Sequence, residues 1–247
     1  MSGEAWLTLA VTILTVAVMA RDMVAPASAV LVRFAELWLS SAFAEHLMAT
    51  AWRMALGYAL AAAVGIGLGL LLGYRPGLPA RSEPLLEFAR PLPSVALMPL
   101  LILLLGIGDE MKVALIFLGA LWPILLNTVD GVRGVHPTLL DVARVHRFGH
   151  RLLLTKVLLP AALPQIMPGL RVSLAVALIL ALVSEMVGAT AGLGRFILLA
   201  LRGFRTADMY AGIVLLALVG YALNRLFLLV ERRLVGHAHE RANEALY

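Results

Sequence analysis

The sequence of 247 residues contains no cysteine, and only 14% of its residues are charged. The absence of thiols excludes disulfide bonds, thiolate metal sites and cysteine nucleophiles. Hydrophobic residues make up 62% of the chain, and the mean hydropathy is +0.94. Because so little polar surface cannot cover a water-soluble globule, the composition indicates a protein with several membrane-spanning helices.

The chain also lacks the motif of a nucleotide-binding site. A phosphate-binding loop needs a lysine directly after a glycine, whereas the two lysines follow Met111 and Thr155. The histidines fit no zinc-protease pattern, and they lie outside the long apolar runs. We therefore expect no catalytic residue, no metal site and no cofactor in this chain.

Six apolar runs are candidates for membrane-spanning helices, because a hydrocarbon core about 30 Å thick requires about 20 helical residues. They cover residues 5–20, 49–73, 91–105, 113–129, 169–189 and 209–230. The first run has no basic region before it and no good cleavage site after it, so we expect a retained span rather than a signal peptide. The predicted architecture is all-α: one polytopic helix bundle over residues 1–247.

The distribution of basic residues predicts the orientation in the membrane. If both termini lie in the cytoplasm, the cytoplasmic connecting segments hold more lysine and arginine than the outer ones, as the positive-inside rule requires. Arg53, Arg171 and Arg225 fall within the ends of spans, where we expect their side chains to reach toward the nearer interface. This orientation places residues 133–168 in the cytoplasm.

Residues 137–168 form a charged segment between two long apolar runs. Basic residues alternate there with leucine and valine at helical spacing, which predicts short amphipathic helices. Pro160, Pro164 and Pro168 lack the N–H group that a helix interior needs, so we expect the chain to break and restart before the next span. From periodicity alone, docking to a protein partner and contact with anionic lipid are equally supported.

Small residues recur every fourth position in the second apolar run, at Gly57, Ala61, Gly65, Gly69 and Gly73. Such a ridge lets another helix approach closely. We expect it to pack against a neighbouring span of the same chain rather than to form a subunit interface.

Four sequence blocks and the loop between them resemble the permeases of binding-protein-dependent ABC importers, in the branch for nitrate, taurine and alkanesulfonates. The blocks are residues 89–110, 122–132, 159–171 and 184–194. The family's loop has the pattern E-A-A, three residues, glycine, nine residues and I-x-L-P. Here Asp141, Val142 and Ala143 occupy the first three positions, Arg147 replaces the glycine, and Pro160 ends the pattern.

The resemblance covers residues 48–233 and implies a type I (MetI-like) importer permease in a bacterial inner membrane. It implies a second permease copy, two cytoplasmic ATPase subunits that bind ATP and Mg, an extracytoplasmic solute-binding protein and membrane lipid as partners, and no nucleic acid. The loop would form a coupling helix that docks on the ATPase. The candidate docking residues are Leu139, Leu140, Asp141, Val142, Ala143, Arg144, His146, Arg147 and Gly149.

Several residues at membrane depth are candidates for lining a translocation pathway, although an apolar bundle also uses such residues for packing. They are Ser94, Met98, Trp122, Asn127, Ser173, Ser184 and Glu185. Glu185 either shapes the outer mouth of the pathway or forms a structural bond, to Arg195 or to backbone N–H groups of residues 188–194. We favour the structural role, because buried charges are usually paired.

Two alternatives to an importer permease have less support from the sequence. A stand-alone secondary transporter or channel is disfavoured because the spans contain no central relay of Asp, Glu or His, and no inverted repeat is visible. A membrane-embedded assembly partner that transports nothing would need no pathway residues. Two amphipathic segments, residues 27–46 and 195–205, are expected on the outer side against a binding protein or lipid.

Overall fold

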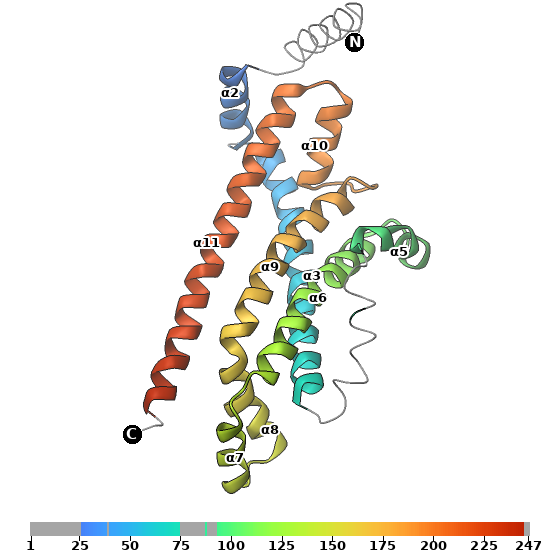
Figure 1. The fold of residues 1–247 in the computed structure, drawn as a ribbon. Coiled ribbons are helices and arrows are strands. Elements are labelled where there is room, and N and C mark those ends of the chain that lie inside the picture. Colours follow the sequence, from blue (N-terminus) through green and yellow to red (C-terminus); the bar gives the residue numbers. More distant parts are fainter. Residues whose placement is uncertain (1–25, 39, 75–86, 88–92, 245–247) are drawn as a thin grey trace, which may run out of the picture.

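The computed structural model describes residues 26–38, 40–74, 87 and 93–244, and within these residues every regular element is helical. The elements form an elongated bundle (Figure 1). They are α2 (Ala27–Trp38), α3 (Ser41–Tyr74), η1 (Ser94–Leu97), α5 (Met98–Leu105), α6 (Asp109–Arg133), α7 (Pro137–Val145), α8 (His150–Leu152), the π-helical η2 (Leu153–Leu158), α9 (Leu159–Glu185), α10 (Leu193–Arg202) and α11 (Thr206–Glu244).

Among the described residues, four stretches of helix are long and apolar enough to cross a membrane: Phe43–Tyr74, Asp109–Arg133, His150–Glu185 and Thr206–Arg233. They coincide with four of the six predicted spans, and the all-α prediction is confirmed. The third predicted span corresponds to the shorter apolar helix Ser94–Leu105. The first, at residues 5–20, lies outside the described residues.

The glycine ridge of α3 packs against α6, as predicted. A Cβ atom at Gly57 would lie 2.7 Å from Ile116 Cγ2, and one at Gly69 would lie 2.5 Å from Thr128 Cβ. Between these positions Ala61 is fully buried. Branched side chains on α6 thus fill the notches left by small residues on α3, which gives close backbone approach without relying on the hydrophobic effect.

Helix α9 packs on the other side of α6 in a similarly close contact. Gly169 would place a Cβ atom 2.7 Å from both the Pro123 carbonyl oxygen and Asn127 Cβ. Ser173 donates a hydrogen bond of 2.7 Å to the Ala120 carbonyl oxygen. The largest hydrophobic core cluster joins α3, α5, α6 and α9, with α6 at its centre.

The predicted chain break at the three prolines is wrong. One uninterrupted helix runs through α8, η2 and α9, with Pro160 in the first turn of α9 and with Pro164 and Pro168 in its interior. The helix continues because the three prolines are spaced four residues apart. The carbonyls that would accept from Pro164 and Pro168 belong to Pro160 and Pro164, so the missing bonds all fall along one face. The π-helical turns of η2 change the hydrogen-bond register just before Pro160.

The two ends of the bundle carry different elements (Figure 1). Helices α2 and α10 lie at one end, here called the α10 end. Helices α7 and α8 lie at the other, the α7 end, together with the last turns of α11. Helix α11 contacts α2, α9 and α10, but between Thr206 and Arg233 it buries few side chains, so most of that stretch is free for lipid or another subunit.

Candidate functional site

A cluster of charged side chains is buried at the α10 end, where Arg53, Lys112 and Glu185 are at most 3% exposed. The Arg53 Nε donates to Asp109 Oδ1 at 2.8 Å, and its Nη1 donates to Glu185 Oε1 at 3.1 Å and to the Ala191 carbonyl oxygen at 2.7 Å. Lys112 Nζ lies 3.7 Å from Asp109 Oδ1. The cluster therefore ties together α3, α6, α9 and the turn before α10.

Glu185 holds the turn between α9 and α10 in place. Its Oε2 accepts hydrogen bonds from Thr50 Oγ1 at 2.9 Å and from the Gly194 backbone N–H at 3.0 Å. Thr50 Oγ1 in turn accepts from the Leu193 N–H at 2.9 Å. Gly192 has a φ of +141°, and a Cβ atom there would overlap the Glu185 carboxylate, so this position requires glycine.

The structure corrects the expectation for Arg53 and decides between the two partners considered for Glu185. Arg53 does not reach toward an interface, because two carboxylates and a carbonyl draw its guanidinium into the protein. Arg195 is not the partner of Glu185 and instead donates to the Ala189 carbonyl oxygen. The backbone partner considered for Glu185 is observed at Gly194. The sequence did contain a signal for the Arg53–Glu185 pair, because one apolar run holds a lone arginine and another holds a lone glutamate.

At the opposite end, α7 is a short helix with defined caps. Pro137 occupies its first turn, and His136 Nδ1 accepts a hydrogen bond of 3.3 Å from the Thr138 N–H. At its C-terminus the Arg147 N–H donates to the Arg144 carbonyl at 2.9 Å, and the Phe148 N–H donates to the Ala143 carbonyl at 3.0 Å. This bonding pattern is a Schellman motif, in which the residue after the cap is usually a left-handed glycine.

Arg147 has a φ of +54°, in the left-handed region that favours glycine. It is also the position at which the resembled loop pattern has glycine. The backbone therefore keeps the turn although the side chain differs. Gly149 has a φ of −66° and an open environment, so its glycine is not required by the local backbone.

The outward face of α7 is apolar. Leu139, Val142 and Val145 are 45%, 48% and 80% exposed. An exposed ion pair borders this face, with Arg144 Nη1 2.8 Å from Asp141 Oδ1. The seven candidate docking residues that are exposed in the structure are Leu139, Asp141, Val142, Arg144, His146, Arg147 and Gly149.

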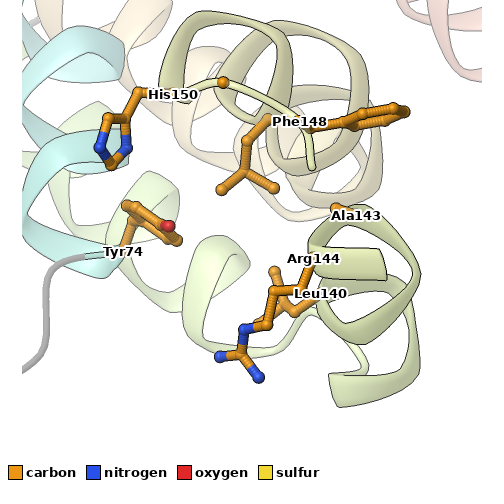
Figure 2. A pocket seen from close by; sticks show the side chains of 8 residues that line it. Tyr74, Leu140, Ala143, Arg144, Phe148 and His150 are labelled. Carbon is orange, nitrogen blue, oxygen red and sulfur yellow. The ribbon is translucent and has the colours of Figure 1, made fainter. Parts of the chain in front are cut away.

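The other two candidate docking residues, Leu140 and Ala143, face the body of the protein. They join a hydrophobic cluster that includes Val135, Leu153 and Leu158 and that also contacts the end of α3. A pocket of about 170 Å³ lies between α7 and α8 (Figure 2). Within it the Tyr74 ring at the end of α3 meets the His150 ring edge-on, with 6.5 Å between ring centroids.

The candidate pathway residues do not form one common surface. Met98, Ser173, Ser184 and Glu185 are buried within this single chain, whereas Ser94, Trp122 and Asn127 are partly exposed. Ser184 donates to the Ala181 carbonyl and Asn127 to the Pro123 carbonyl, each within its own helix. These two donors are therefore already used inside the fold.

Comparison with known proteins settles the family. Residues 65–236 match the family described as the binding-protein-dependent transport system inner membrane component. This chain belongs to that family. The permease is 38% identical over 206 residues to the aliphatic sulfonates transport permease protein SsuC of Bacillus subtilis, an alignment that covers 83% of this chain and 75% of the relative. It is 31% identical to the nitrate import permease protein NrtB of Leptolyngbya laminosa, covering 77% and 68% of the two chains.

The fold of the permease is also similar to that of a solved transporter. The permease matches a chain of the inward-facing MetNI methionine ABC transporter with a TM-score of 0.66 and 21% sequence identity, covering 76% of this chain and 93% of that one. The expected MetI-like fold is confirmed. The protein is thus a multi-pass inner-membrane permease subunit of an ABC importer and belongs to a transport family rather than to a family of enzymes.

Proposed function

We propose that two copies of this permease enclose a pathway for a small oxyanion and that two separate ATPase subunits, which bind ATP and Mg, drive the transport. The α7 end faces the cytoplasm, with both termini on that side. An extracytoplasmic solute-binding protein delivers the solute to the α10 end. The relatives SsuC and NrtB are named for sulfonates and nitrate, which share an anionic group bearing oxygen atoms.

The exposed apolar face of α7 is the observation that supports ATPase docking. Leu139, Val142 and Val145 form this face on a helix beyond the ends of the long apolar helices. Apolar side chains exposed outside the membrane favour contact with another protein, and a short amphipathic helix fits a groove on its partner. The Asp141–Arg144 pair at the rim would orient the contact.

The contacts behind α7 explain how the motion of the docked helix would reach the membrane. Ala143 is 3% exposed and packs in one cluster with side chains of α6, η2 and α9. The Tyr74–His150 contact adds the end of α3. Because close-packed interiors transmit displacement rather than absorb it, movement of α7 would shift the neighbouring ends of all three spans.

The test uses Val142→Asp and Val145→Asp, which place a charge on the proposed docking face. We expect both variants to insert in the membrane normally but to lose co-purification with the ATPase and ATP-driven uptake in vesicles. Thr155→Asp is the matched control, since Thr155 is exposed in the same loop but lies on η2 rather than on the apolar face. Wild-type uptake by both valine variants would overturn docking through α7, and uptake without any ATPase would identify a secondary transporter.

A further inference from the structure

Two arginines at the α10 end, Arg33 and Arg53, are neutralised within the chain. Arg53 contacts Asp109 and Glu185, and Arg33 contacts Glu36 and Asp208 at 2.6 Å each. These two carboxylates raise the pKa of Arg33 above its usual value. The fold therefore provides two carboxylates for each of these two arginines.

Two arginines in the other half of the bundle lack such partners. Arg171 of α9 donates its Nε to Asn224 Oδ1 of α11, at 3.2 Å. Arg225 donates its Nε to Tyr221 Oη at 2.8 Å, with its guanidinium carbon 5.2 Å from the centre of the Tyr221 ring. Among the described residues, no carboxylate lies within ion-pair distance of either arginine.

The unused donors of the two arginines lie on adjacent helices. Each guanidinium has five N–H groups, and in each case the described contacts occupy only the Nε–H. Tyr221, Asn224 and Arg225 share one face of α11 by their i, i+3 and i+4 spacing. The hydrogen bond between Arg171 and Asn224 brings α9 to that face. Both arginines and Tyr221 are exposed, so a ligand has access.

The cluster lies near the end of the hydrocarbon core that is closer to the α7 end. At 1.5 Å per residue, Arg171 lies about 21 Å along α9 from Glu185, and Arg225 lies about 28 Å along α11 from Thr206. Both therefore lie toward the α7 end of a hydrocarbon core about 30 Å thick. Ionisable groups within membrane-spanning helices are usually paired or functional.

We propose that Arg171, Asn224, Arg225 and Tyr221 form an oxyanion-binding site between α9 and α11. Guanidinium forks match the geometry of carboxylate, sulfonate and phosphate groups, and Asn224 and Tyr221 fix the Nε–H of each fork. Two sources have this chemistry. One is the transported oxyanion, and this source alone rests on the proposed function. The other is the phosphate of an anionic lipid in the adjacent leaflet.

Binding to the purified full chain tests the site without any ATPase. In the first arm, sodium methanesulfonate or sodium nitrate is titrated against sodium chloride at equal ionic strength, and the melting temperature is measured. In the second arm, native mass spectrometry measures retention of phosphatidylglycerol against phosphatidylcholine. We expect preferential stabilisation in the first arm if the solute is the ligand, and preferential retention of phosphatidylglycerol in the second if the lipid is.

The variants Arg225→Gln and Arg171→Gln/Arg225→Gln should weaken whichever preference the wild type shows by about tenfold or more, because charge-assisted hydrogen bonds are lost. Arg225→Gln alone disturbs only contacts within α11 and keeps the test valid if the double variant does not fold. Arg202→Gln on α10 is the control for the loss of one exposed positive charge and should behave as wild type. The proposal would be overturned if the wild type preferred neither the solute oxyanion nor phosphatidylglycerol, or if the arginine variants kept the wild-type preference. Neither result would contradict the proposed ATP-driven transport.

Discussion

At the scale of single residues, charge pairing decides where the polar side chains of this permease lie. Arg53 and Glu185 come from different apolar helices, and each is nearly fully buried. Taking two charges out of water is costly, and their attraction repays the cost only with further hydrogen bonds. Thr50, Gly194 and Asp109 provide these bonds. The pair is therefore sensitive to the loss of either partner.

Glu185→Gln should lower the free energy of unfolding by about 3 kcal/mol, because the amide leaves the buried Arg53 with one carboxylate fewer. Thermal unfolding of the purified chain measures this loss. Glu36→Gln is the matched control, because its partner Arg33 is exposed and such surface pairs contribute less than about 1 kcal/mol. Unchanged melting of Glu185→Gln together with altered solute-dependent transport would instead identify Glu185 as a pathway residue.

Arg147 shows how a sequence can depart from a family pattern and keep its structure. Its left-handed φ and the Schellman hydrogen bonds place it where a glycine is usual. The substitution costs roughly 1 kcal/mol or more of backbone strain, since a side chain there clashes with its own backbone. The position therefore defines the end of α7 whichever residue occupies it.

At the scale of elements, hydrophobicity predicted the four long spans of the described residues, and small-residue spacing predicted that α3 packs against a neighbouring span, because both follow from local periodicity. The proline prediction failed because it treated each proline separately, whereas their common spacing puts the missing bonds on one face of a continuous helix. The burial of the Arg53 side chain was not predicted, for a different reason. Its partners Asp109 and Glu185 are distant in sequence, and only the packing of three helices brings them together.

Gly69→Ala should destabilise the permease by about 1–3 kcal/mol, because the new methyl group would lie 2.5 Å from Thr128 Cβ and force α3 and α6 apart. The second-site change Thr128→Gly should restore much of this loss, since it opens the facing space. Gly67→Ala is the control, because nothing lies within 4 Å of a Cβ atom there. Equal melting temperatures for Gly69→Ala and Gly67→Ala would show that the ridge does not hold the two helices together.

At the scale of the whole molecule, the two ends have surfaces of different kinds. Helix His150–Glu185 contains 36 residues and spans about 54 Å at 1.5 Å per residue, well beyond the hydrocarbon core. This helix therefore places the α7 end and the α10 end on opposite sides of the membrane. Basic residues in the α7 loop and the positive-inside rule support the proposed placement of the α7 end in the cytoplasm.

This orientation can be tested directly because the chain has no cysteine of its own. Val145 on α7 and Phe204 after α10 are matched sites, with 80% and 81% of each side chain exposed. A membrane-impermeant maleimide should label Phe204→Cys but not Val145→Cys in intact spheroplasts, and the reverse should hold in inside-out vesicles. The cysteine-free parent gives the background in both preparations. Labelling of Val145→Cys from outside intact spheroplasts would place the α7 face on the wrong side for a cytoplasmic ATPase, and both the orientation and the docking proposal would then fail together.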